Sequence, residues 1–207
     1  MSREPATLVI LAGGESERMG FPKHELSVGG VDILTHLGRR LGDSFVETIV
    51  VGRDLDRVPH GIRVTEDRYI ARSPLVGVHA GLCASRTELC FVTGCDMPHI
   101  EPGLVEHVLR RASGFDVTVP VVHGYDEPLL AAYRTTCISA IEGLIARQRL
   151  RVSGLFEIVL TNRIPETEIR EHDAGLRSVE NINLATEAER VRTRAVTRRQ
   201  RPPDRSR

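Results

Sequence analysis

The stretch at residues 6–14, ATLVILAGG, decides the fold of this chain. It is a run of aliphatic and β-branched residues, too short for a helix, that ends in Gly13 and Gly14. Such a run predicts a strand buried on both faces and followed at once by a tight turn. Strands of this kind are typical of parallel sheets covered by helices. We therefore take residues 6–11 as the first strand of an α/β domain.

Alternation of strands and helices continues after this stretch. Further buried-strand patterns lie at residues 45–51, 62–65 and 89–93. The helices expected between and after them span residues 31–41, 75–84 and 103–111. This order predicts a single three-layer α/β domain, with a mostly parallel twisted sheet and helices on both faces.

The second half of the chain adds a smaller antiparallel extension. Strands are expected at 116–122 and 128–133, and the turn at His123-Gly124 between them implies that they are antiparallel. Beyond them we expect helices at 138–146 and 152–159, a strand at 166–170 and a short helix near 185–190.

Composition limits the class of protein. The chain has 207 residues, of which 41% are hydrophobic and 27% charged, and no apolar run approaches the roughly 20 residues that a membrane-spanning helix needs. The apolar stretch near the N-terminus is too short for a signal peptide, so we expect a cytoplasmic protein. The four cysteines form no CxxC pair, which favours reduced thiols over a disulfide framework or a zinc site.

The C-terminal end differs from the rest of the chain. From residue 190 onward there are eight arginines and one aspartate, so this end carries +7 and the preceding body −7. We therefore divide the chain into a domain at 1–190 and a basic, disordered tail at 191–207. A solubilising role is favoured over an RNA or partner-protein contact, because no aromatic residues are interleaved with the arginines.

Lysine is almost absent from this chain. Of its 28 basic residues, only Lys23 is not arginine. A lysine kept against such a bias, soon after a glycine turn, indicates a need for a compact ammonium group rather than a planar guanidinium. The alternative is that one lysine survived by chance.

The loops after the expected strands should carry the chemistry, because ligands of open α/β sheets bind beyond the carboxyl ends of the strands. In the first loop, Gly13 and Gly14 can turn successive N–H groups toward a polyphosphate, and Arg18 and Lys23 add positive charge. The loop has neither the GxGxxG pattern of dinucleotide-binding sites nor the Gly-Lys-Ser/Thr ending of a Walker loop, so dinucleotide binding and P-loop hydrolysis lose their usual support. A Gly-Gly pair by itself would indicate only a tight turn.

The pattern LAGGxSxRMGxxK at residues 11–23 resembles the signature of the molybdenum cofactor guanylyltransferases and related nucleotidyltransferases. Further pieces follow in the family's order: ED at 66–67 with SPLVG at 73–77, GCDMP at 94–98, EPL at 127–129 with AY at 132–133, and NIN at 181–183. The resemblance implies a Rossmann-like nucleotidyltransferase fold.

The resemblance also implies roles for individual residues. Leu11, Ala12, Gly13 and Gly14 would hold the nucleotide through backbone atoms, and Lys23 would contact its phosphates. Asp67 would lie near the nucleoside, and Gly52 fills a position where the family places an amide side chain near guanine. Asp96 would bind Mg²⁺, which usually takes one or two carboxylates and completes its shell with phosphate and water. Judged from position alone, Asp96 could equally be a helix N-cap.

The implied reaction is transfer of GMP from GTP to a phosphate of molybdopterin, with release of pyrophosphate. Its catalytic residues would be Arg18, Lys23 and Asp96. Glu127, Asn181 and Asn183 would contact the second substrate. Transient contacts with enzymes that insert or receive the molybdenum cofactor are a further expectation, whereas membrane and nucleic-acid partners are not expected.

Several alternatives stay open. Ser73 stands where the family has glycine, and Asn183 is followed by Leu-Ala instead of Thr-Pro, so base selection and the acceptor are less firmly implied. A CTP-dependent molybdopterin cytidylyltransferase is one alternative, and a sugar-phosphate or phospholactate nucleotidyltransferase is another. A non-catalytic nucleotide-binding regulator is a third, which the joint presence of Arg18, Lys23 and Asp96 disfavours.

Overall fold

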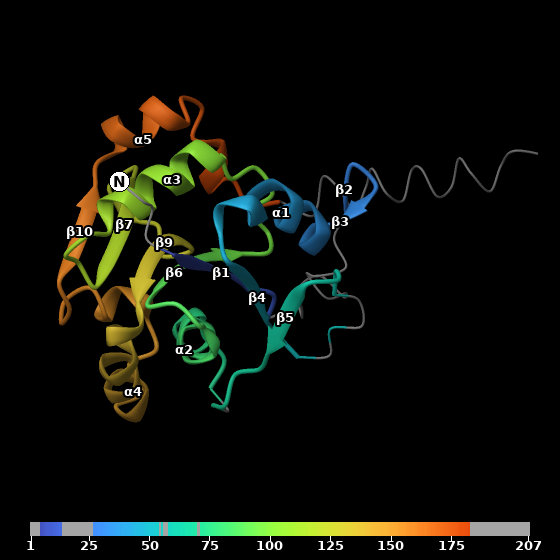
Figure 1. The fold of residues 1–207 in the computed structure, drawn as a ribbon. Coiled ribbons are helices and arrows are strands. Elements are labelled where there is room, and N and C mark those ends of the chain that lie inside the picture. The colour runs from blue at the N-terminus through green and yellow to red at the C-terminus, as the bar shows by residue number, and fades with distance from the viewer. Residues whose placement is uncertain (1–4, 14–26, 54, 56–57, 70, 183–207) are drawn as a thin grey trace, which may run out of the picture.

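A central sheet runs through the part of the chain that the computed structural model describes, namely residues 5–13, 27–53, 55, 58–69 and 71–182 (Figure 1). Its strands follow the order β10-β7-β9-β6-β1-β4-β5, and β8 pairs with β7 beside this path. These strands are β1 (Ala6–Leu11), β4 (Glu47–Val51), β5 (Ile62–Thr65), β6 (Leu89–Gly94), β7 (Val117–Val122), β8 (Tyr125–Asp126), β9 (Leu130–Arg134) and β10 (Thr161–Ile164). A separate antiparallel pair joins β2 (Ser27–Val28) and β3 (Val31–Asp32).

Five α-helices occur among the described residues, with short 3-10 turns between them. The helices are α1 (Ile33–Leu41), α2 (Pro74–Ala84), α3 (Pro102–Arg111), α4 (Ile138–Ala146) and α5 (Glu166–His172). The 3-10 turns are η3 (Gly42–Ser44), η4 (Thr135–Cys137), η5 (Val152–Gly154) and η6 (Arg177–Val179). None of the helices is long and apolar enough to cross a membrane.

The two halves of the sheet differ in strand direction. β1 lies between β4 and β6, and both pairs are parallel, as is the pair of β4 with β5. β9 then runs antiparallel between β6 and β7, while β10 is parallel to β7. The predicted mostly parallel sheet with a small antiparallel extension is therefore confirmed.

Apolar side chains fill a layer on each face of the sheet. Successive residues of β1 point to opposite faces: Leu8 and Ile10 pack with α1 and α3, and Val9 and Leu11 pack with α2 and α4. All six residues of β1 are buried, as the uninterrupted apolar run predicts. In Figure 1, α1, α3 and α5 lie above the sheet, and α2 and α4 lie below it. The three predicted layers are present.

Two predictions in the last third of the chain are wrong. The expected helix at 152–159 is the 3-10 turn η5 followed by further turns, and the expected strand at 166–170 is the helix α5. The strand of this region is β10, whose sequence TNRI carries little apolar signal because it lies at the edge of the sheet. The expected helix near 185–190 and the predicted tail lie outside the described residues.

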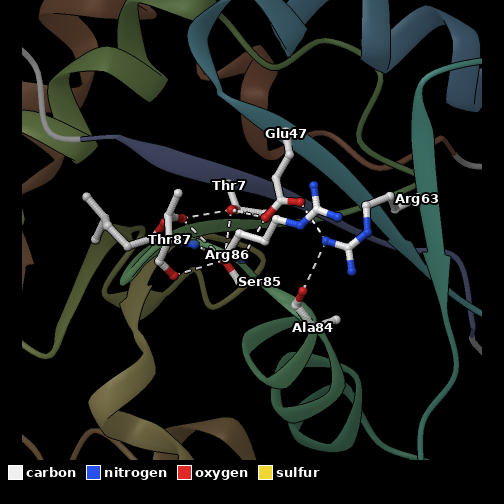
Figure 2. Close-up of polar contacts among 8 residues, drawn as sticks. Thr7, Glu47, Arg63, Ala84, Ser85, Arg86 and Thr87 are labelled. Atoms are coloured by element: carbon white, nitrogen blue, oxygen red, sulfur yellow. Dashed lines mark hydrogen bonds and ion pairs between the residues drawn. The ribbon is translucent and has the colours of Figure 1, made fainter.

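A polar network surrounds the Glu47 carboxylate at the edge of the sheet where β1 and β6 begin (Figure 2). Oε1 accepts hydrogen bonds from the Thr7 hydroxyl at 3.0 Å and the Arg86 backbone N–H at 2.7 Å. Oε2 accepts from Arg63 Nη1 at 2.6 Å. Burial raises the pKa of Glu47, but the hydrogen bonds from Arg86, Arg63 and Thr7 outweigh it, so the pKa lies below its ordinary value.

Glu47→Gln is expected to lower the free energy of unfolding at pH 7 by about 1–2 kcal/mol, since hydrogen bonds to a charged group are worth about 1.5–3 kcal/mol each and the amide keeps some of them. A carboxyl whose pKa is depressed on folding stabilises the protein above its unfolded pKa, here about 4.5, and that stability is lost as the pH falls through the folded pKa. The difference in the free energy of unfolding between wild type and variant, measured by urea denaturation, should therefore narrow below pH 4.5. A difference that stays constant with pH would contradict the charge-based explanation.

Candidate active site

The carboxyl ends of four parallel strands meet at one edge of the sheet and are bonded to one another. The N–H of Ala12 donates to the Val51 carbonyl at 2.8 Å, and the N–H of Gly52 donates to the Thr65 carbonyl at 3.0 Å. On the other side, the Cys95 N–H donates to the Leu11 carbonyl at 3.0 Å. The predicted convergence of these loops is confirmed. Because the sheet uses the Ala12 amide, a nucleotide contact from Ala12 has to come from its carbonyl.

Gly52 allows the first two loops to approach closely. A Cβ at this position would lie 3.3 Å from the Ala12 Cβ and 3.3 Å from the Leu55 methyl groups, tighter than most real contacts. The backbone of Gly52 also passes Gly13, whose own Cβ would lie 3.9 Å from the Gly52 Cα. Gly52 therefore shapes the wall beside the first loop, and only a residue without a side chain fits there without displacing a neighbour.

Asp96 lies just beyond β6, next to the first loop. Its side chain is half-buried and lies over Gly94, where a Cβ would be 2.6 Å from Asp96 Oδ1 and 3.5 Å from a Leu129 methyl group. Gly94 thus leaves the space that the carboxylate occupies. The alternative that Asp96 caps a helix is wrong, because α3 begins at Pro102 and its N-cap is Glu101.

Asp67 follows β5 and is held by a residue that sequence reasoning missed. Arg53, directly after Gly52, forms an ion pair with the Asp67 carboxylate and donates to the carbonyls of Asp67 at 3.2 Å and Tyr69 at 3.4 Å. The pair joins the loops that follow β4 and β5. The sequence could have indicated Arg53, because it lies just after the end of a strand, where charged residues face the ligand crevice.

One departure from the family's pattern, Ser73, has a local cause. Ser73 stands in the place of the family's glycine because it is the N-cap of α2: its side chain accepts from the Val76 N–H at 3.4 Å, and Pro74 occupies the first helical position. Serine at the N-cap and proline after it are favoured helix starts.

Two of the predicted second-substrate residues, Glu127 and Asn181, belong to segments that approach the end of β6 and the backbone of Asp96. Leu130 pairs with Thr93 at the end of β6, which brings the segment from Glu127 to Leu129 alongside Gly94. Burial raises the pKa of Glu127, and the nearby His123 only partly offsets this. From the C-terminal side, Asn181 is exposed, and the next residue, Ile182, donates its N–H to the Asp96 carbonyl at 2.8 Å.

Several predicted site residues lie outside the described residues: Gly14, Arg18, Lys23 and Asn183. The structure therefore brings together the strand-end residues Leu11, Ala12, Gly13, Gly52 and Asp96, with Asp67, Glu127 and Asn181 around them.

A divalent cation suits the donor set at Asp96. The Asp96 carboxylate occupies the space over Gly94, and one protein carboxylate is sufficient where phosphates and water complete the shell, as is usual for Mg²⁺. Among the residues that the structure describes, no group of three His, Cys, Asp or Glu side chains could enclose a metal.

Comparison with known proteins identifies the family. Residues 8–157 match the model of the MobA-like NTP transferase domain, which is more than half of the chain. The chain belongs to this family. This NTP transferase is 34% identical over 195 residues to a "probable molybdenum cofactor guanylyltransferase" of Pelotomaculum thermopropionicum, and the match covers 92% of this chain and 93% of the relative.

Solved structures agree with this assignment. Molybdopterin-guanine dinucleotide biosynthesis protein A from Archaeoglobus fulgidus matches this NTP transferase with a TM-score of 0.76 at 25% identity, covering 92% of this chain and 99% of that one. The 2-C-methyl-D-erythritol 4-phosphate cytidylyltransferase of Thermus thermophilus matches with a TM-score of 0.61 at 20% identity, covering 78% and 88%. The second likeness shows a shared fold alone. The chain is a nucleotidyltransferase, and enzymes of this kind use a divalent metal ion.

Proposed function

We propose that this chain transfers GMP from GTP to the terminal phosphate of molybdopterin, forming the guanine dinucleotide cofactor and pyrophosphate. The observation that carries the proposal is the bond from the Cys95 N–H to the Leu11 carbonyl at 3.0 Å, which puts Asp96 directly beside the loop that follows β1. The relatives named as molybdenum cofactor guanylyltransferases match over almost the whole chain, so the acceptor side is included in the likeness.

The proposed chemistry is a direct displacement at phosphorus. A terminal phosphate oxygen of molybdopterin attacks the α-phosphorus of GTP, the bond from that phosphorus to the bridging oxygen of the β-phosphate breaks, and pyrophosphate leaves. Bound Mg²⁺ would neutralise charge on the triphosphate oxygens, with Asp96 as its protein ligand. No protein nucleophile is required, so the chain's task is alignment and charge stabilisation.

Individual residues divide this task. The peptide groups from Gly13 to Gly14 would cradle the phosphates, and Arg18 and Lys23 would offset the charge that develops on pyrophosphate. Gly52 and Asp67 would face the nucleoside, where Arg53 orients the Asp67 carboxylate. Glu127, Asn181 and Asn183 would contact the acceptor on the opposite side of Asp96.

The nucleotide preference is the sharpest test of this proposal. With Mg²⁺ and molybdopterin present, pyrophosphate release is expected to be at least about 100-fold faster with GTP than with CTP, ATP or UTP, since a site that hydrogen-bonds a base rejects one that leaves its polar groups unpaired. Faster release with CTP would move the chain to the cytidylyl branch. No release with any nucleotide would contradict the proposal, and sugar phosphates and phospholactate would then be tried as acceptors.

The proposal includes a compartment and protein contacts. None of the four cysteines is in a disulfide bond, which is compatible with the reducing cytoplasm, where we place the reaction. Transient contacts with enzymes that insert or receive the finished cofactor belong to the same proposal. They can be tested by following whether such an enzyme accelerates product release.

A further inference from the structure

The loop between β6 and α3, residues 95–101, is held at both ends by one segment from near the C-terminal side of the described chain. At the Asp96 end, the Ile182 N–H donates to the Asp96 carbonyl at 2.8 Å. At the other end, the Glu101 N–H donates to Ser178 Oγ at 3.0 Å. These contacts join positions 77 or more residues apart in sequence, and nothing in the local sequence of the loop predicts them.

Helix α1 supports the middle of the same loop. His36 Nε2 lies 2.9 Å from the Pro98 carbonyl oxygen, and Arg40 Nε donates to the Ile100 carbonyl at 2.6 Å. Arg40 also forms an ion pair with the Glu101 carboxylate at 2.9 Å. The loop is therefore fixed on one side by α1. The 173–182 segment adds a hydrogen bond at each of the loop's two ends.

Asp173 organises that segment. Its buried carboxylate accepts the Ser178 N–H at 2.7 Å and the Arg177 N–H at 3.1 Å, and its own carbonyl accepts the Leu176 N–H at 3.0 Å. Leu176, which lies between Asp173 and Arg177 in sequence, is buried and has a φ of 54°, a left-handed conformation that is unfavourable for leucine. The turn is therefore maintained by the bonds to Asp173.

Ser178 connects this turn to the loop. It is fully buried; its N–H is taken by Asp173, and its hydroxyl oxygen accepts the Glu101 N–H. The bond to Asp173 fixes the position of Ser178, and the buried Ser178 hydroxyl in turn fixes the position of the loop at Glu101. The same turn leads within four residues to Ile182, whose N–H sets the direction of the Asp96 carbonyl and hence of the residue's backbone.

We propose that Asp173 and Ser178 are positioning residues for the reaction: through Ser178–Glu101 and Ile182–Asp96 they fix the Asp96 carboxylate relative to the nucleotide loop. In this role neither residue would touch substrate or the metal. The inference rests on the proposed function, because it takes Asp96 as the residue that would hold the metal. Misplacement of a catalytic group by about 1 Å can cost about 100-fold in rate, so loss of one support should be measurable.

Ser178→Ala can be compared with Ser85→Ala, a matched control. Ser85 lies at the opposite edge of the sheet, where its hydroxyl oxygen lies 2.8 Å from Thr7 Oγ1 and 2.9 Å from the Thr87 carbonyl oxygen, and can donate to one of them (Figure 2). Each variant loses one hydroxyl from a hydrogen-bond network, and each should lower Tm by about 2–4 °C. Only the first change is connected to Asp96.

The readout is Mn²⁺ binding in the presence of GTP, followed by electron paramagnetic resonance of the free ion, together with steady-state kinetics. Ser178→Ala is expected to weaken Mn²⁺ binding about 3- to 10-fold and lower kcat about 10-fold, with KM for GTP changed less than about twofold. Ser85→Ala should leave all three near wild type. Equal behaviour of the two variants would overturn the proposal.

Two provisions keep the test decisive. If Ser178→Ala does not fold, Asp173→Asn replaces it: the amide keeps the shape but loses an acceptor for one of the two N–H groups, and weaker Mn²⁺ binding is again expected, with Glu47→Gln as its control. Mn²⁺ binding can be measured without the second substrate. A wild-type protein that binds Mn²⁺ with GTP but makes no product would contradict the proposed function. The comparison of Mn²⁺ binding by the variants would still decide the positioning role. A wild type that binds no Mn²⁺ with GTP would overturn both.

Discussion

Asp96→Ala is expected to remove at least about 3 kcal/mol of transition-state stabilisation, about 100-fold or more in kcat/KM for GTP, by analogy with the loss of other stabilisers of developing charge. The expectation depends on where the carboxylate lies. Asp96 lies just beyond β6, and its carboxylate occupies the space left by Gly94. The N–H of the neighbouring Cys95 donates a hydrogen bond to the Leu11 carbonyl at 3.0 Å. A carboxylate so placed lies beside the carboxyl end of β1.

The measurement is pyrophosphate release over a range of Mg²⁺ concentrations, with thermal unfolding as the check on folding. Asp116→Asn is a suitable control, because Asp116 precedes β7 at the opposite edge of the sheet, where its carboxylate accepts from Thr136 and from the Leu160 N–H. The control should show a stability loss without a change in Mg²⁺ dependence. Near-normal turnover by Asp96→Ala would remove Asp96 from the metal role.

Buried strands were the most predictable part of this fold. The bounds expected for the fully buried β1 are those observed, and the edge strand β5 and helix α4 also begin and end where predicted. Strands covered on both faces require continuous apolar runs, and such runs are visible in one sequence without further information. The same strands located the site, since their carboxyl ends are where ligands of such sheets bind.

The errors in the last third of the chain have different causes. Residues 166–170, ETEIR, contain a single apolar residue, Ile169, so they show little hydrophobic periodicity. Glu166 and Glu168 in the first turn and Arg170 and His172 in the last nevertheless favour a helix through the macrodipole, and Pro165 is its N-cap. That charge pattern is visible in the sequence. Edge strand β10, by contrast, is too short and polar to be found before its pairing with β7 is known.

Candidate site residues divide in the same way. Gly13, Gly52, Asp67 and Asp96 follow strands, and the structure brings them to one edge of the sheet as predicted. Ser178 accepts a hydrogen bond from Glu101, 77 residues away in sequence, and Asp173 acts only through Ser178, so no spacing rule could indicate either residue. A single sequence does not show which residues far apart in the chain form hydrogen bonds with each other.

Gly81→Val is expected to lower the free energy of unfolding by about 3 kcal/mol or more, at the upper end of the overpacking range. Gly81 lies inside α2, where a Cβ would be 2.4 Å from one Val9 methyl group and 3.1 Å from the other. Val9 is fully buried in β1, and its branched side chain has little freedom to rotate away. The helix approaches the sheet this closely only because residue 81 has no side chain.

A matched pair of alanine variants separates this packing from helix propensity. Alanine normally stabilises a helix by about 1 kcal/mol over glycine, so Gly143→Ala in α4, whose Cβ would meet only the flexible end of Arg147, should raise stability. Gly81→Ala should instead lower it by about 1–2 kcal/mol, because the clash exceeds the propensity gain.

Chemical denaturation of Gly81→Ala, Val9→Ala and the double variant completes the test. Removing the Val9 methyl groups makes room for the new Cβ, so the double variant should be at least about 1 kcal/mol more stable than the sum of the single effects predicts. Additive losses would mean that α2 shifts as a whole on the sheet. Such a shift would also move Gly77, whose Cβ would lie 3.2 Å from the Leu11 methyl groups at the edge of the candidate site, and so would appear as a change in KM for GTP.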